Sequence, residues 1–126
     1  MRGINYDDRF FAPVSNTENG EVGSATLFHY RQRGDVVWAT YEGGGVTFGT
    51  LVATVDGEGR LDMRYGHVNS DGRLMTGVCE SVPERLPDGR LRLRERWRWT
   101  SGDRSRGEST VEEVERPAGS SGARNG

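Results

Sequence analysis

Apolar and polar residues alternate along most of the chain, in short segments separated by turn signals. The clearest case is the stretch 90–99, RLRLRERWRW, in which arginine occupies every even position. Successive side chains of a strand point to opposite faces, so this pattern is typical of a strand with one buried and one hydrated face. Segments of this kind, rich in Val, Thr, Tyr, Phe and Trp, are found at about 8–14, 25–33, 36–42, 46–55, 60–68, 73–82, 90–100 and 108–116.

The boundaries between these segments carry residues that favour tight turns. Asn-Gly or Asp-Gly pairs occur at Asn19-Gly20, Asp56-Gly57, Asp71-Gly72 and Asp88-Gly89, and they tolerate the positive φ angles that short hairpins require. No segment shows the periodicity of an amphipathic helix over a useful length. The sequence therefore predicts an all-β protein, built as a single antiparallel up-and-down meander of eight or more strands.

A meander leaves its first and last strands as open edges, and closure into a barrel removes both. We therefore predict a calycin-like or lipocalin-like barrel formed by residues 1–116, with an open meander curled over itself as the alternative. Residues 117–126, PAGSSGARNG, begin with proline and contain no large apolar side chain. We expect this C-terminal tail to be disordered.

Composition excludes several classes of function. The 126 residues carry 17 basic and 19 acidic side chains, a formal charge of −2, which is not the basic surface expected of a nucleic-acid-binding protein. The first fifteen residues contain acids where a signal peptide would be apolar, and no run has the length of a membrane-spanning helix. We expect a cytoplasmic protein with neither a nucleic-acid nor a membrane partner.

Cofactor and metal sites are not expected either. The single cysteine, Cys79, and the two histidines, His29 and His67, show no ligand spacing typical of a metal site. The glycine run at 43–45 lacks the Lys-Ser/Thr of a phosphate-binding loop and precedes a strand rather than a helix.

The arginine stretch also fixes which of its faces is buried. Five arginines cannot be buried without partners, so the even positions point to solvent and the odd positions, which include Trp97 and Trp99, point inward. The arginines could form an anion-binding or nucleic-acid-binding stripe. We instead expect them to be neutralised by the acidic segment 108–115, ESTVEEVE, on the next strand.

Glu95 is the exception on the inward face. If the tip of the next hairpin lies within 101–107, the register places Glu95 opposite either Glu112 or Glu113. Two facing carboxylates disfavour double ionisation and raise one pKa, which would make Glu95 a candidate general acid or an anchor for a cationic ligand. Alternatively, an inward arginine or tyrosine satisfies Glu95, or it lies in water at the barrel mouth. We predict that it is inside and hydrogen-bonded.

Other polar side chains are expected to join Glu95 in the interior. Strand periodicity places Met63, Tyr65 and His67 on one face of segment 60–68, and this face is the more apolar one. Tyr65 and His67 are thus candidate catalytic residues together with Glu95, unless their polar ends only satisfy each other. We predict a ligand-binding set lined by aromatic side chains, composed of Glu95, Trp97, Trp99, Tyr65, Met63, Tyr30 and Trp38, with Tyr41 and Phe28 as further aromatic candidates.

Several runs resemble a known family. They are DMRYGHVNSDGRLMTGVCESVPE at 62–84, RERWRWTSGDRSRGES at 94–109, PVSNTENGE at 13–21 and FHYRQ at 28–32. With nearly all of residues 6–115 covered, the chain resembles a family of small bacterial proteins that carry the label N-acetylglutamate synthase. The positions that match the family pattern are Met63, Arg64, Tyr65, Asn69, Gly77, Cys79, Ser81, Glu95, Trp97 and Trp99.

This resemblance implies no catalytic residue. Known synthases of that name transfer the acetyl group on an α/β domain with a pyrophosphate loop at a helix N-terminus, and this sequence predicts no helix. Gly66-His67 also departs from the family pattern, which has a bulkier polar pair with histidine first. We therefore do not expect acetyl transfer.

Three functional hypotheses follow. The first is a small-molecule ligand bound in an aromatic-lined lumen beside an inward carboxylate. The second is a filled barrel that acts through its surface or through a homodimer interface. The third is a cofactor-free barrel enzyme of the cyclase, isomerase or hydrolase type that uses Glu95.

Overall fold

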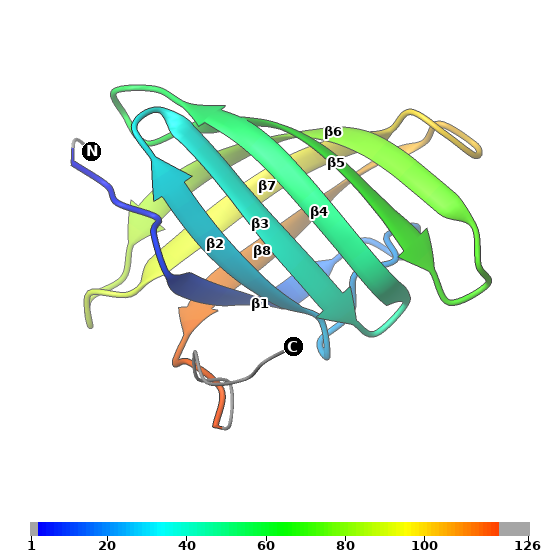
Figure 1. Ribbon diagram of the computed structural model, residues 1–126, viewed down its shortest axis with the longest axis horizontal. Helices are drawn as coiled ribbons and strands as arrows, with labels where there is room; N and C mark the ends of the chain where they lie inside the picture. Colours follow the sequence, from blue (N-terminus) through cyan, green and yellow to red (C-terminus); the bar gives the residue numbers. More distant parts are fainter. Residues whose placement is uncertain (1–2, 119–126) are drawn as a thin grey trace.

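The computed structural model describes residues 3–118, which form a closed antiparallel β-barrel (Figure 1). Neighbouring strands in the barrel are neighbours in sequence, and the first strand pairs with the last. The predicted all-β meander and its closure are thus confirmed. The eight strands are β1 (Arg9–Asn16), β2 (Leu27–Arg33), β3 (Val36–Gly43), β4 (Val46–Val55), β5 (Leu61–Asn69), β6 (Leu74–Arg85), β7 (Leu91–Trp99) and β8 (Arg106–Val114).

The β1–β8 ladder closes the barrel. Phe10 lies opposite Val114, Ala12 opposite Glu112, and the register shifts between Pro13 and Ser15. Proline has no backbone N–H to donate, and a bulge is one of the few places where a sheet accepts it. The register shift after Pro13 leaves Val14 without a ladder partner, and the two terminal strands pair on both sides of it.

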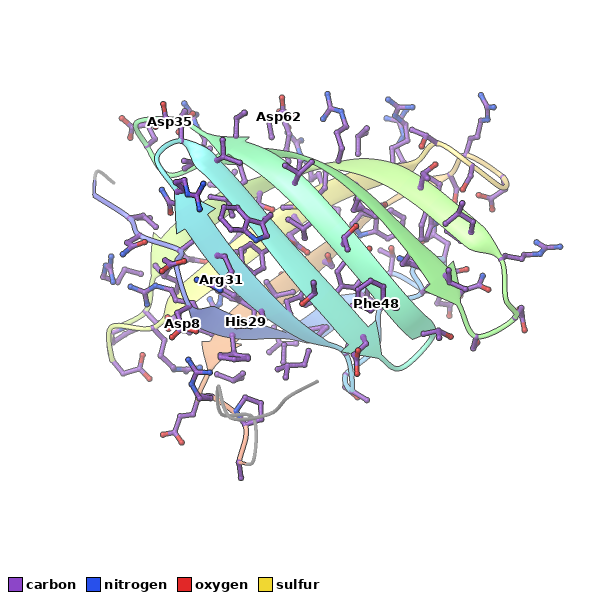
Figure 2. All side chains as sticks on the ribbon, viewed as in Figure 1. Asp8, His29, Arg31, Asp35, Phe48 and Asp62 are labelled. Atoms are coloured by element: carbon purple, nitrogen blue, oxygen red, sulfur yellow. The ribbon has the colours of Figure 1, made fainter. Side chains whose placement is uncertain are left out.

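Side chains alternate between the interior and the surface along every strand. On β7 the odd positions are turned inward, with Leu91 and Leu93 fully buried, while the arginines lie outside as predicted. Outward side chains on other strands include Arg31, Phe48 and Asp62 (Figure 2). The alternation read from the sequence therefore sorts most residues correctly between core and solvent.

Acidic residues on both neighbouring strands neutralise most of the arginine row. On the β8 side, the Arg92 guanidinium lies 2.7 Å from the Glu112 carboxylate. On the β6 side, Arg94 lies 2.8 Å from Glu84. The Arg94–Glu84 pair is largely exposed and contributes little to stability, whereas Arg92 and Glu112 are half-buried. Arg90, Arg92, Arg94 and Arg96 thus have acidic partners, whereas Arg98 lies opposite Arg106 on β8.

The predicted register of the β7–β8 hairpin is wrong. Glu95 lies opposite Ser109, and neither Glu112 nor Glu113 faces it. The hairpin turns earlier than expected, around Gly102 and Arg104, which have φ angles of 60° and 57°. Because Glu112 pairs with Arg92 on the outer face, the carboxylate pair expected beside Glu95 does not form.

One end of the barrel, called the filled end, is packed with large buried side chains. It is the end at which β1 begins, on the left in Figure 1, and the segment before β1 folds across it. The Tyr6 ring is fully buried there, and its hydroxyl donates a hydrogen bond to the Gly59 carbonyl oxygen at 2.5 Å. Large side chains fill the space behind it, and those with at most 2% exposure include Phe11, Tyr30, Val37, Leu61, Leu91, Leu93 and Val111.

Two predictions concern the rest of the chain. Of the C-terminal tail predicted at 117–126, all but residues 117 and 118 lie outside the described residues. Among residues 3–118, no helix is long and apolar enough to span a membrane.

Candidate functional site: a pocket at the second end of the barrel

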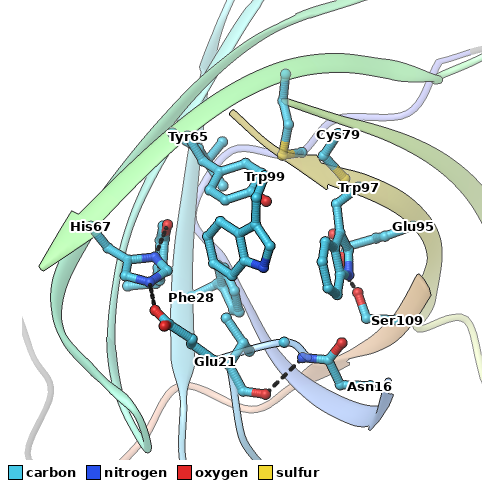
Figure 3. A pocket seen from close by; sticks show the side chains of 15 residues that line it. Asn16, Glu21, Phe28, Tyr65, His67, Cys79, Glu95, Trp97, Trp99 and Ser109 are labelled. Carbon is cyan, nitrogen blue, oxygen red and sulfur yellow. Dashed lines mark hydrogen bonds and ion pairs between the residues drawn. The ribbon is translucent and has the colours of Figure 1, made fainter. Parts of the chain in front are cut away.

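The opposite end of the barrel contains a cavity of about 50 Å³, shown from close by in Figure 3. Side chains from β1 to β8 and the loop between β1 and β2 surround it. The lining residues are Asn16, Gly20, Glu21, Val22, Phe28, Tyr41, Leu51, Met63, Tyr65, His67, Cys79, Glu95, Trp97, Trp99 and Ser109.

Glycines on the inner face make room for the rings at this end. Gly49 lies between Tyr41 and His67 in the ladder, and a Cβ there would come within 2.7 Å of both side chains. Gly77 lies opposite Tyr65, and a Cβ on it would overlap the tyrosine hydroxyl. Barrel interiors alternate small and large residues to fit their taper. The glycines therefore allow large rings to lie across the inner wall and leave space in the middle.

The aromatic side chains meet mainly edge to face. The Trp97 and Trp99 ring centroids are 5.6 Å apart at 60°, and Trp99 and Tyr65 are 5.8 Å apart at 64°. On the other side, Phe28 and Tyr41 stack at 4.7 Å. Such contacts fix the ring planes as well as burying apolar area. The result is a rigid aromatic wall around the cavity.

Glu95 supplies the carboxylate at the base of the pocket. Ser109 donates a hydrogen bond to its Oε1 at 2.8 Å, and Ser81 donates one to its Oε2 at 3.3 Å. Burial raises the pKa of Glu95 from 4.5 to about 7, since the loss of hydration outweighs the two hydroxyl hydrogen bonds that favour the charged form. Glu95 is thus inside and hydrogen-bonded, as predicted, although its partners are serines.

The groups around Glu95 are neutral at physiological pH. Burial raises the pKa of the Tyr30, Tyr41 and Tyr65 hydroxyls and of the Cys79 thiol, and the charge of Glu95 raises each of them further. Glu95 is accordingly the group that changes charge near neutral pH at the base of the pocket.

A second set of polar side chains, joined by hydrogen bonds, lies at the pocket mouth. His67 is 2% exposed, and its Nδ1 lies 2.9 Å from the Tyr41 hydroxyl. Its Nε2 lies 2.8 Å from Oε1 of Glu21, as Figure 3 shows. Asn69 donates a hydrogen bond to the other Glu21 oxygen at 3.0 Å. Both ring nitrogens of His67 are therefore occupied by protein partners.

The β1–β2 loop, residues 17–26, closes over this end. Glu21 joins it to His67 and Asn69 on β5, and the Trp99 indole donates a hydrogen bond to the Asn19 carbonyl oxygen at 3.1 Å. Asn16 donates one from Nδ2 to the Val22 carbonyl oxygen at 2.9 Å. The loop is thus a lid held by polar contacts, in contrast to the apolar plug of the filled end.

The structure brings most of the predicted site residues together. Of the seven predicted ligand-binding residues, five line the cavity, namely Met63, Tyr65, Glu95, Trp97 and Trp99, as does the candidate His67. Of the two histidines, His67 points inward, whereas His29 lies outside, with Nε2 2.9 Å from Asp8.

Two predicted positions are corrected. Trp38 is on the outer face, because β3 turns Val37, Ala39 and Tyr41 inward. Tyr30 is fully buried, but it packs in the core and does not line the cavity. The β3 segment has apolar residues at both odd and even positions, so its alternation did not decide which face is inside.

Sequence reasoning also missed several residues of the pocket. Glu21 lies in a loop, where no periodicity indicates a direction. Ser81 and Ser109 could have been found only with the correct register, which places them on either side of Glu95. Asn16 reaches the pocket from the end of β1, close to the Pro13 irregularity.

Residues 3–118 contain no group of three His, Cys, Asp or Glu side chains placed to hold a metal ion. The pocket is suited to binding, because its walls are apolar rings and its polar groups converge from the base and the mouth. A catalytic role for Glu95, Tyr65 or His67 stays a prediction.

Comparison with known proteins gives one family. Neither the curated proteins nor the solved structures yield a match. A family model described as avidin-like protein matches residues 4–114, which include all eight strands and every residue that lines the pocket. The chain therefore belongs to the avidin-like protein family.

Proposed function

We propose that this protein binds a small molecule in the pocket bounded by Trp97, Trp99 and Glu95. The observation that carries the proposal is the difference between the two ends: one has a carboxylate beside a cavity, and the other has a core of large buried side chains. Glu95 is half-buried and has no counter-charge among the residues that the structure describes, which costs stability, and a ligand that binds beside it can offset that cost.

Membership of the family supports the same function. The avidin-like family has a calycin-type barrel fold, and it binds small ligands such as biotin. Biotin is therefore one probe for this pocket. Its binding would be tested by calorimetry with the protein stripped of any bound molecule by unfolding and refolding.

Native mass spectrometry of freshly purified protein tests the proposal without choosing a ligand. We expect a bound small mass that is lost on denaturation. Leu51→Phe places a larger side chain into the cavity from β4 and should abolish the bound mass. Val52→Phe is the matched control, because Val52 is the next residue and is 52% exposed on the outer face.

Two results would count against the pocket. One is a bound mass that persists in Leu51→Phe at the wild-type level. The other is the absence of any bound mass together with no heat of binding for biotin, n-hexylamine, 1-hexanol or hexanoate.

A surface function is the second candidate, and a specific feature favours it. The outer face of β3 and β4 carries the half-buried Trp38 beside Val36 and Val52, which are 44% and 52% exposed. Members of the avidin-like family often form oligomers. A homodimer through this face would show a doubled mass at micromolar concentration, and Val52→Glu should reduce it to the monomer mass.

A further inference from the structure

The pocket is lined by acidic side chains and by no arginine in the described part of the chain. The two acidic side chains are Glu21 and Glu95. The sequence contains no lysine. Among the lining side chains, His67 could carry a positive charge, and its two ring nitrogens face Tyr41 and Glu21. The pocket therefore supplies negative charge and no positive group to hold an anion.

Each oxygen of the two carboxylates accepts one hydrogen bond, and the two residues differ in position and partners: Glu21 lies in the β1–β2 loop at the mouth, and Glu95 lies at the base beside two serines. Both oxygens of Glu21 are engaged, one by His67 and one by Asn69. Each oxygen of Glu95 accepts a single hydroxyl hydrogen bond, although a carboxylate has about four acceptor positions. Glu95 thus has unused acceptor capacity and lies within the cavity lining.

A second acceptor among the lining residues, the side-chain oxygen of Asn16, has no hydrogen-bond donor among residues 3–118. This Oδ1 atom is buried. The orientation of this amide is fixed, since its Nδ2 donates to the Val22 carbonyl oxygen. An unpaired buried acceptor is costly unless a ligand donates to it. Asn16 and Glu95 can therefore both accept a hydrogen bond from a ligand that is a donor.

The aromatic walls of the pocket also suit a positively charged group. Trp97 and Trp99 meet at 60°, and Tyr65 adds a third ring beside Trp99. Aromatic rings set at angles attract a cation through their negative faces, and tryptophan does so best. The cavity of about 50 Å³ has room for about three to five water molecules. A group of about that many heavy atoms would be enclosed.

We propose that the ligand of this pocket presents a positively charged nitrogen group, an ammonium or a guanidinium, which binds to the Glu95 carboxylate against the indoles of Trp97 and Trp99. The apolar body of the ligand leads from this group toward the mouth at Glu21. This inference rests on the proposed small-molecule function and adds the chemical class of the ligand. It assigns Glu95 the role of counter-charge.

Three probes with the same apolar body test the charge: n-hexylamine, 1-hexanol and hexanoate. Binding to the stripped protein is measured at pH 8, where the amine is protonated. The methods are calorimetry and tryptophan fluorescence. We expect hexylamine to bind at least about 10-fold more tightly than hexanol, which is about 1.4 kcal/mol, and hexanoate to bind least.

Two variants test whether the amine binds to the Glu95 carboxylate. Glu95→Gln should weaken hexylamine binding by at least about 10-fold and hexanol binding by much less, because the glutamine side-chain oxygen can still accept a hydrogen bond from the hydroxyl. Glu80→Gln is the matched control, because it removes the same charge from the outer face of the neighbouring strand β6. It should change neither affinity.

The outcomes separate the two proposals. Equal binding of the three probes, or tighter binding of hexanoate, would overturn the cationic ligand and leave small-molecule binding in place. If no probe binds and the purified protein carries no small mass, both proposals fail. Because the comparison of probes uses the wild-type protein, it decides the question even if Glu95→Gln does not fold.

Discussion

The two ends of this barrel are built from the same eight strands and differ in what the inward positions carry. Toward the filled end, branched aliphatic side chains such as Leu61, Leu91 and Leu93 close the space, and Tyr6 covers them. Toward the other end, rings face glycines, and Glu95 lies at the base of the cavity. The filled end shows how this fold is stabilised, and the pocket end shows where the same fold leaves a cavity beside a carboxylate.

The largest expected effect concerns the filled end. Leu93→Ala would leave a hole in a fully packed region and should lower the free energy of unfolding by about 2–5 kcal/mol. Leu51→Ala should cost less, because Leu51 already borders the cavity and has fewer contacts to lose. Urea denaturation of both variants measures the difference, and an equal loss at the two sites would break the comparison.

The next prediction concerns pH and the pocket end. Because the pKa of Glu95 is about 7 in the folded protein and 4.5 ordinarily, the folded state holds this proton more tightly than the unfolded chain. Its stabilising contribution is complete below about pH 4.5 and is lost as the pH rises through 7. This change corresponds to about 3 kcal/mol.

Glu95→Gln should remove this dependence and make the stripped protein more stable than the wild type at pH 8. Urea titrations between pH 5 and 8 give the free energy of unfolding of both proteins at each pH. The slope against pH should be steeper for the wild type than for the variant. Tyr30, Tyr41, Tyr65 and Cys79 stay neutral in this range, because burial raises the pKa of each. Parallel slopes for the two proteins would contradict the burial of the Glu95 charge.

A smaller effect is expected at the lid. Glu21→Gln removes the charge that holds the β1–β2 loop to His67 and should lower stability by about 1 kcal/mol. Amide hydrogen exchange should become faster in residues 17–26 and stay unchanged in β6 and β7. Glu18→Gln, an exposed position in the same loop, is the control. Unchanged exchange in the loop would mean that Glu21 is not its anchor.

The smallest effect is expected on the outer face. Arg94→Gln breaks a largely exposed pair with Glu84 and should change the free energy of unfolding by less than about 0.5 kcal/mol. Thermal unfolding at low and high salt measures it. A large loss would show that the arginine row stabilises the barrel, rather than simply meeting solvent.

The sequence predicted the architecture because two local signals agreed along the whole chain. Alternation placed Trp97 and Trp99 inside and the arginines outside, and the Asp-Gly and Asn-Gly pairs marked several of the turns. Both signals are local, and a barrel that follows sequence order needs no long-range information to be recognised.

The details of the pocket depended on information that is not local. The β7–β8 register is set by the turn at Gly102 and Arg104, and a polar stretch such as 100–106 offers several places for that turn. An error there moved Ser109 away from Glu95 and put Glu112 or Glu113 in its place. Trp38 was misplaced because β3 is apolar on both faces, and Glu21 was missed because a loop has no periodicity.

The central claim is that a small molecule binds among Trp97, Trp99 and Glu95, while Trp38 lies outside the barrel. The indole N–H signals of the three tryptophans, assigned by single Trp→Phe variants, test it most directly. The small-molecule fraction recovered from denatured protein is added back to the stripped, ¹⁵N-labelled protein. We predict that the Trp97 and Trp99 signals shift and that the Trp38 signal stays in place. Three unchanged signals, or a shift of Trp38 alone, would contradict the account.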